Sequence, residues 1–571
     1  MRSTTPSPID DTAVEDLSPS GPFRALKQFG LILLCSAWVA FGLAGHDPWK
    51  TEDAVSIGVA AEMAERGDAV IPTLAGEPYL RHPPLAYVGG ALAIKAFAPP
   101  LKVHNAARLI AGVALVLILL ATAYASRELS GRALRWLPVL ILVGSIGFWD
   151  RAHIVSPELF LTVGVAIGLW GFALALRAPA LGGVLLGIGV GIAFLGRGLL
   201  GPLWLIVAAL LLPACGAAWR SRAHAITVAI AAATALLVAL PWVVALQARD
   251  PLLFRLWWDS EALRHYVAGF GGGAADPLYY LRNLLWFAFP ALPLVVWMLW
   301  LRMRKFNGGM AQPGIIVPGV LALVILASLL VLPESKLHNA LPLLVPLAML
   351  AALEVDSLKR GLSSALDWFG ILTFGLVALL FWGVWLDSYL NGMSPGVAKL
   401  FRDTESGFQP SFHLGTMLAA VGLTVLWVLL VRPARQSNRR TMLNWAAGVT
   451  LVWGLASTIW LPYLDSRRSY RWTVDPWPSI CPRKAALPVG IWVSRNARYS
   501  IISRVSRPFA RRLRHRTIAV RYSCNMDGLP VNLPRRQDGL PCGPAAGVVT
   551  TPNDSRSTQG HHSEIHRRSN H

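Results

Sequence analysis

Charged side chains are scarce in this sequence of 571 residues: Asp, Glu, Lys and Arg together make up 15% of it. Soluble globular domains carry roughly 25% charged residues. Hydrophobic residues reach 54%, and the mean hydropathy is +0.50. A chain so poor in charge is not an ordinary soluble protein. Its composition predicts one large membrane domain, built from apolar segments of about 20 residues each.

Cysteine is also rare, with five residues and no CxxC pair or Cys/His spacing typical of zinc. Cysteine therefore says little about the chemistry. The first 27 residues are polar and partly acidic, and no small-residue cleavage site follows the first apolar run. We expect no removable signal peptide. Residues 1–27 are predicted to be a cytoplasmic segment that precedes a retained first helix.

Long apolar windows occupy most of the remaining chain. Thirteen of them are predicted to cross the membrane, at 28–45, 105–126, 133–149, 157–177, 182–196, 198–214, 224–247, 283–301, 314–332, 339–353, 369–386, 415–431 and 443–462. A further apolar stretch at 83–100 is broken by Gly and by Lys95, so it is predicted to be interfacial or re-entrant. The predicted fold class is an all-α polytopic membrane protein with about 13 transmembrane helices.

The loops between these windows alternate in charge. If the N-terminus is cytoplasmic, the cytoplasmic loops contain "SRELSGRALR", "WRSRAH", "RMRKFNGG", "DSLKRG" and "RPARQSNRR", all of them basic. The opposite loops, at 46–104, 150–156, 248–282, 333–339 and 387–414, mix acids, His, Pro, Gly and Trp. Short cytoplasmic loops of membrane proteins collect Lys and Arg. The alternation therefore predicts a cytoplasmic N-terminus and places the mixed loops on the outer face.

The composition changes again after Pro462. Residues 466–571 hold 19 Lys and Arg against 5 Asp and Glu, without a sustained helical or strand period. The membrane domain is predicted to span 28–465, and 466–571 to be a basic C-terminal tail. A disordered tail that binds anionic lipid or nucleic acid is one interpretation, although the predicted topology puts the tail outside. A shift of reading frame after "LPYLDSRRSYRW" is the other, and neither assigns the tail a function.

One apolar window has a stripe of small residues. In "GGVLLGIGVG", Gly183, Gly187 and Gly191 recur every four residues and so share one helix face. Small residues let the backbones of membrane helices approach closely. We expect this stripe to be a helix-packing surface without a catalytic role.

Two acids, Glu52 and Asp53, stand in the first outer loop, where "TEDAVSIGVAAEMAERG" has the apolar period of an amphipathic surface helix. One interpretation is structural, because the helix dipole favours negative charge in the first turn. The other is a general base or an electrostatic role beside an apolar cavity. Spacing alone does not decide between the two.

The continuation of this loop, "GDAVIPTLAGEPYLRHPPLAYVGG", supplies a longer motif. Together the two stretches resemble the N-terminal signature of bacterial polyprenyl-phosphate-sugar glycosyltransferases related to the aminoarabinose transferase of lipid A, and more distantly of protein O-mannosyltransferases. The resemblance implies the GT-C membrane fold, with amphipathic helices in the first outer loop. That family usually has Asp then Glu where this chain has Glu52 and Asp53, and Glu-Lys where it has Arg81 and His82.

The resemblance implies roles for residues in several outer loops. Glu52 and Asp53 match the catalytic acids, which would orient or deprotonate the acceptor. Binding of the donor phosphate is expected from the cations Arg81, His82, Arg197, Arg264, Lys336 and His338. Further cavity candidates are His153, Glu158 and Glu261. Without the resemblance, the commoner explanation of Lys336 and His338 is that they extend from a helix end toward the interface.

The implied function is transfer of a sugar from undecaprenyl phosphate, or another polyprenyl phosphate, to lipid A or another envelope glycolipid. It would take place at the periplasmic face of the bacterial inner membrane and invert the anomeric centre. Whether a divalent metal ion binds at the acids stays open, and no nucleic-acid partner is expected. Protein hydroxyls are an alternative acceptor. A lipid or solute transporter is an alternative of another class, which should show inverted repeats and acids at mid-membrane depth. An inactive copy is a further alternative.

Overall fold

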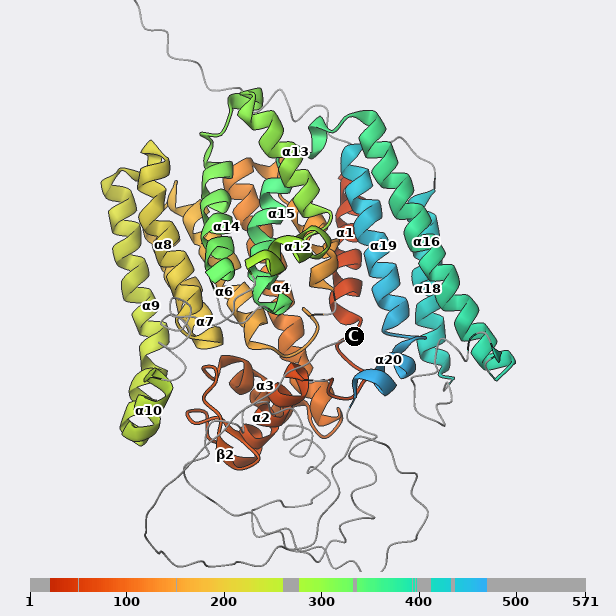
Figure 1. Ribbon diagram of the computed structural model, residues 1–571, viewed down its shortest axis with the longest axis horizontal. Coiled ribbons are helices and arrows are strands. Elements are labelled where there is room, and N and C mark those ends of the chain that lie inside the picture. Colours follow the sequence, from red (N-terminus) through yellow and green to blue (C-terminus); the bar gives the residue numbers. More distant parts are fainter. Residues whose placement is uncertain are drawn as a thin grey trace, which may run out of the picture. The chain divides into compact units, whose positions relative to one another are not determined.

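The computed structural model describes residues 21–469 except for residues 50, 150, 260–276, 332–335, 393, 396, 398–411 and 433–436. The predicted tail, 466–571, therefore lies almost wholly outside the described residues, and so do Glu261 and Arg264. The described part is a helical bundle with a smaller group of elements at one end, the lower end in Figure 1.

Seven of the described helices are long and apolar enough to cross a membrane. They are α4 (Val103–Ser130), α6 (Pro157–Ala175), α7 (Pro179–Arg197), α9 (Arg222–Arg249), α14 (Pro313–Val331), α16 (Arg360–Leu390) and α18 (Leu414–Val431). Two bent pairs raise the count to nine if each pair is one span: α12 (Pro277–Phe287) with α13 (Ala291–Met303), and α19 (Asn438–Ala456) with α20 (Leu461–Arg468). The polytopic all-α class is confirmed, whereas the count of thirteen spans is not.

Apart from α2, described below, the remaining helices have shorter apolar stretches. They are α1 (Gly21–Ala40), of which Gln28–Ala40 is apolar, α3 (Leu85–Phe97), α5 (Leu137–Val143), α8 (Leu200–Cys215), α10 (Pro251–Trp257) and α15 (Leu344–Ala352). The described 3₁₀ helices are η2 (Arg132–Leu134), η3 (Ile146–Phe148), η4 (Ala217–Trp219), η6 (Phe306–Gly308), η7 (Leu337–Leu343) and η8 (Val355–Ser357).

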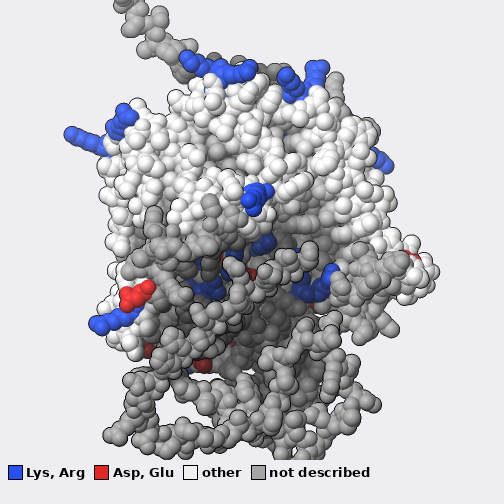
Figure 2. Space-filling view, viewed as in Figure 1, with Lys and Arg blue, Asp and Glu red and all other residues white. Residues whose placement is uncertain are grey.

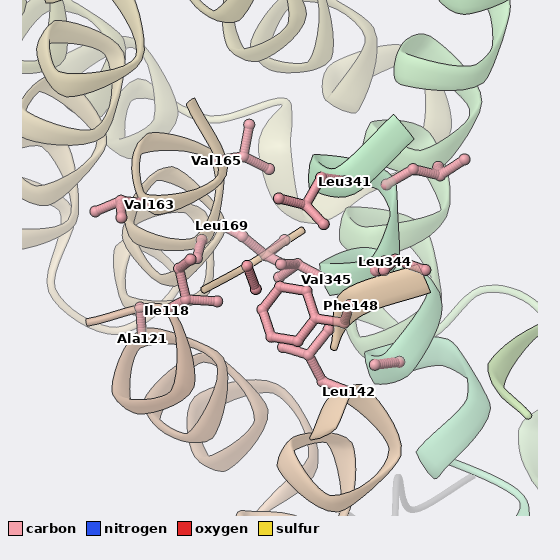
Figure 3. Close-up of a cluster of buried hydrophobic side chains, with 14 of the residues drawn as sticks. Ile118, Ala121, Leu142, Phe148, Val163, Val165, Leu169, Leu341, Leu344 and Val345 are labelled. Carbon is pink, nitrogen blue, oxygen red and sulfur yellow. The ribbon is translucent and has the colours of Figure 1, made fainter. Parts of the chain in front are cut away.

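The window at 133–149 does not form a spanning helix. Helix α5 contains seven residues, starts with Pro138 in its first turn and ends at Gly144, and all seven side chains are buried. Figure 3 shows Leu142 of α5 and Phe148 of η3 in a cluster with side chains of α4, α6, η7 and α15. The apolar character of this window therefore reflects burial against protein, and a hydropathy plot does not distinguish this from lipid contact.

The predicted glycine stripe is confirmed as a packing surface. A Cβ at Gly187 would lie 2.5 Å from the carbonyl oxygen of Ala231, and one at Gly183 would lie 2.7 Å from that of Thr227. Both carbonyls belong to α9, which packs along α7. The absence of side chains on this face lets the two backbones touch.

The first outer loop folds into α2 (Glu52–Arg66), a two-stranded hairpin of β1 (Thr73–Leu74) and β2 (Glu77–Pro78), and α3. Ala75 and Gly76 both have positive φ, as a tight two-residue hairpin turn requires. The carboxylate of Glu62 accepts hydrogen bonds from both of their N–H groups, which attaches the turn to α2. Helix α3 packs against α2 and α4.

Elements of the predicted outer loops lie together at one end of the described helices. Elements α2, β2, α3, α10 and α20 lie at the lower end of Figure 1, as expected for loops on one side. Figure 2 shows Lys and Arg along the opposite edge, above a broad surface that carries few charges. The apolar windows of α9 and α18 are only 11% buried, so most of their surface is available to lipid.

Candidate active site

A buried carboxylate, Glu158, lies at the centre of the candidate site. Helix α6 begins at Pro157, and the Ser156 side chain caps it by accepting the N–H of Leu159, so Glu158 falls in the first turn. The positive end of the helix dipole favours a carboxylate there. Glu158 is 3% exposed, and its Oε2 atom has no hydrogen-bond partner within the described ranges.

Two basic side chains face the other oxygen of Glu158. Its Oε1 lies 3.4 Å from Nε of Arg197 and 3.7 Å from Nε2 of His338. Arg197 is the last residue of α7 and precedes Gly198, whose φ of +81 turns the chain into α8. The two basic groups come from α7 and η7, so the fold brings together parts of the sequence about 140 residues apart.

Arg197 also contacts His82, the residue before Pro83 and Pro84. Its Nη1 lies 2.9 Å from the His82 ring, and its Nη2 donates to Oδ1 of Asn339 at 3.1 Å. A guanidinium donates only, so the contacted His82 nitrogen is an acceptor in this arrangement. His82 is 8% exposed. Arg81 lies close enough for its charge to act on Glu158.

Tyr280 completes this side of the site. Its hydroxyl donates to the carbonyl oxygen of Lys336 at 3.1 Å and accepts the Lys336 N–H at 3.2 Å, and it hydrogen-bonds Asn339. Lys336 and His338 are therefore held at the entrance to η7, beside Arg197. Among the predicted donor-site residues, Arg197, His338 and Arg81 act on Glu158. His82 contacts Arg197, and the charge of Lys336 acts on His338. The permanent charges of Arg197, Arg81 and Lys336 suit a phosphate.

The two acids of α2 have different surroundings. Asp53 is 1% exposed and forms an ion pair of 2.7 Å with Arg108 of α4. Its two oxygens also accept the N–H groups of Trp49 and Val155. Glu52 is half-buried, and its charge acts on His338. Both acids start α2 as the structural interpretation predicts, and of the two only Glu52 has a charge that acts on His338.

A histidine lies beside this ion pair. His46, in the loop after α1, is 1% exposed and stacks on Trp49 with ring centroids 4.0 Å apart. Burial, followed by the charge of Arg108, lowers the pKa of His46 from 6.5 to about 4. A neutral ring here adds no further positive charge around Arg108.

The structure places the remaining candidates elsewhere. His153 packs between the rings of Trp38 and Trp453, and its ring nitrogens contact the carbonyl oxygens of Trp149 and Trp38. Glu261 and Arg264 lie outside the described residues. Among the described residues, no group of three or more His, Cys, Asp or Glu is arranged to hold a metal ion.

Sequence reasoning missed Asn339, Tyr280 and Arg108. Tyr280 resembles the aromatic residues that anchor helices at the membrane interface, so its residue type does not indicate a place in the candidate site. The sequence does draw attention to Arg108, because a lone guanidinium inside a predicted membrane span needs a buried partner. Its sequence position does not reveal that the partner is Asp53.

The helical bundle and the polar cluster at one of its ends define a polytopic membrane protein of the GT-C fold. Over 85% of either chain, the structure matches the crystal structure of ArnT from Cupriavidus metallidurans bound to undecaprenyl phosphate, with a TM-score of 0.61 and 17% identity. The apo form of that protein matches over 81% of either chain, with a TM-score of 0.58 and 20% identity. At these identities the likeness establishes the fold.

Curated relatives confirm the resemblance found in the sequence. Undecaprenyl phosphate-alpha-4-amino-4-deoxy-L-arabinose arabinosyl transferase 1 of Pseudomonas fluorescens is 26% identical over 374 residues, which is 62% of this chain and 65% of the relative. The corresponding transferase of Pseudomonas aeruginosa is 27% identical over 362 residues, 60% of this chain and 63% of the relative. The chain thus spans just under two thirds of these relatives' length. No family model matches it.

Proposed function

We propose that this protein is a membrane glycosyltransferase that moves a sugar from a polyprenyl phosphate to an envelope acceptor such as lipid A. The observation that carries the proposal is the basic cluster of His82, Arg197, Lys336 and His338, together with the half-buried Glu52, whose charge acts on His338. The names of the relatives support undecaprenyl phosphate as the carrier and an aminoarabinose as the sugar. These names specify no acceptor, so lipid A is proposed on the resemblance described in the sequence analysis.

The cluster suits the charge changes of such a transfer. An acceptor oxygen attacks the anomeric carbon, the bond from that carbon to the phosphate oxygen breaks, and polyprenyl phosphate leaves with the bonding electrons. Negative charge develops on the phosphate, and cations held in place before the reaction stabilise it best. Arg197, Arg81 and Lys336 carry permanent charge for this role in the proposal, with His82 and His338 beside them.

Glu52 is proposed to act on the acceptor side. The hydroxyl proton of the acceptor needs a carboxylate with an oxygen free to accept it. Asp53 has both oxygens engaged by Arg108, Trp49 and Val155. Glu52 is half-buried, and its charge acts on His338 of the cluster. It therefore suits the role of general base or orienting group.

The predicted orientation belongs to the same proposal. The cluster lies at the end of the bundle that carries α2, α3 and α10, opposite the basic loops. If the basic loops are cytoplasmic, the cluster opens toward the periplasm. A lipid-linked donor would then reach it from the outer leaflet of the inner membrane.

The proposal is tested by sugar transfer from purified undecaprenyl-phosphate aminoarabinose to lipid A in detergent. Glu52→Gln is expected to lower kcat by about 10²- to 10⁴-fold, as loss of a general base does, with donor affinity retained. Glu65→Gln, which removes an exposed carboxylate from the same helix, is the matched control and should keep the native rate. Equal rates for the native chain and Glu52→Gln would refute the role of Glu52.

Mass spectrometry of envelope lipids identifies the acceptor independently. Lipid A from cells that express the native chain should carry the added sugar, and lipid A from cells that express Glu52→Gln should not. If the sugar appears on proteins instead, the acceptor in the proposal is wrong although the reaction class stands.

A further inference from the structure

Arg108 is a fully buried cation that the proposed chemistry does not use. It lies in the second turn of α4 and is 0% exposed. A guanidinium sealed away from water is strongly unfavourable unless acceptors surround it. A fold that keeps such a group within a membrane helix therefore depends on its partners.

Those partners all belong to the first outer loop. Nη1 of Arg108 donates to the carbonyl oxygen of His46 at 2.8 Å, and Nη2 donates to the carbonyl oxygen of Asp47 at 2.8 Å. Nη2 also reaches Oδ2 of Asp53 at 2.7 Å. One side chain of α4 thus fixes both the path of the chain after α1 and the first turn of α2.

Asp53 extends this network to a third segment. Its Oδ2 accepts the Trp49 N–H and its Oδ1 accepts the Val155 N–H, each at 3.2 Å. Val155 stands three residues before Glu158, and Asp53 directly follows Glu52. A single carboxylate therefore connects the segment that carries Glu52 to the segment that carries the cluster's central acid.

We propose that Arg108 and Asp53 are positioning residues that set the distance between Glu52 and the cluster of Glu158, Arg197 and His338. This inference rests on the proposed function, since it assigns the pair a role through Glu52. The cations of the cluster lie on α7, on η7 and before α3, and they are held by Asn339 and Tyr280. Loss of the pair therefore moves Glu52, while Arg197 and Lys336 keep their contacts with Asn339 and Tyr280.

The expected effect is a change in kcat without a change in donor affinity. Asp53→Asn leaves Arg108 without its anionic partner, and Arg108→Lys keeps the charge but loses the fork that reaches three acceptors. A displacement of about 1 Å at a reacting group lowers rates by about 10²-fold. We expect either variant to lower kcat by about 10- to 100-fold while its Kd for undecaprenyl phosphate stays within about twofold of the native value.

A second buried ion pair provides a matched control. Arg302 and Glu354 are 2.7 Å apart and almost fully buried, and Glu354 follows α15, whereas His338 precedes it. Glu354→Gln should lower the melting temperature and leave kcat per folded molecule unchanged. If Asp53→Asn behaves in the same way, the pair has a merely structural role and the inference is wrong. Should Asp53→Asn not fold, Arg108→Lys is judged by the same criteria.

A double-mutant cycle separates this inference from the proposed function. If Asp53 acts through Glu52, Asp53→Asn should lower kcat in the native background and have no further effect in the Glu52→Gln background. Equal effects in both backgrounds would overturn the positioning role. Full activity of Glu52→Gln alone would instead refute the proposed function, so the two failures are distinguishable.

Discussion

At the scale of single residues, His46 gives the fold a dependence on pH. Its ring is buried beside Arg108 and Asp53, and its pKa is lowered from 6.5 to about 4. Above pH 6.5 the ring is neutral in the folded and the unfolded chain, so it contributes no pH dependence. Between pH 6.5 and 4 the unfolded chain binds the proton more readily. The free energy of unfolding therefore falls as pH falls, by about 3 kcal/mol in total.

Unfolding of the purified protein in detergent, followed between pH 7 and 4, measures this contribution. The His46 ring nitrogens contact the carbonyl oxygens of Asp47 and Gly42. His46→Gln is the control, because an amide can donate to these carbonyl oxygens but does not titrate. Relative to the native chain, the variant should gain about 3 kcal/mol in unfolding free energy between pH 7 and pH 4. A difference that stays constant over this range would contradict a buried neutral histidine.

The sequence predicts which residues lie in the candidate site better than it predicts the surroundings of each residue. Residue type and motif single out Glu52, Asp53, Arg197 and His338, and the structure brings three of them near Glu158 or Arg108. It does not reveal that Asp53 has both oxygens engaged. That fact depends on Arg108 and Val155, which only the fold brings to α2.

At the scale of helices, the contact of α7 with α9 depends on glycines, which have no side chain to separate the two backbones. In Gly187→Ala the new Cβ would lie 2.5 Å from both the Ala231 carbonyl oxygen and Thr234 Cβ, so the helices must separate. Overpacking of this kind costs about 1–3 kcal/mol. Gly383→Ala in α16 is the control, because its Cβ meets nothing within 4 Å. Thermal unfolding in detergent should show a loss for the first variant and none for the second.

Helix positions are more predictable than helix lengths. Apolar windows locate α4, α6, α9 and α14 to within a few residues, because a span needs about 20 apolar residues. The window at 283–301 became two helices bent by 99° around Pro290, where the missing N–H interrupts the helix. Proline marks the break in the sequence, but the bend angle depends on the neighbouring helices.

At the scale of the whole molecule, the arrangement of basic loops makes the topology testable. Cysteines introduced at Ala69, which is exposed after α2, and at Lys305, which is exposed before η6, should lie on opposite sides of the membrane. With the native cysteines replaced, a membrane-impermeant maleimide applied from the periplasmic side should label Ala69→Cys in intact cells. Labelling of Lys305→Cys should require permeabilised membranes. The reverse pattern would invert the predicted orientation.

The last described helix is joined to the first outer loop. Oδ1 of Asp465 accepts the Asp47 N–H at 3.0 Å and the Trp49 indole N–H at 3.2 Å, and Ser469 pairs with Trp49 as an isolated β-bridge. Asp465 follows Asp47 by 418 positions, so during synthesis this additional contact of the first outer loop forms only after Asp465 has been made. The contacts of the loop with Arg108 and Val155 involve residues made much earlier. A nascent chain interrupted before α20 would insert most of its membrane spans but would lack the contacts of Asp465 with Asp47 and Trp49. A frame change beyond Ser469 would leave these contacts intact.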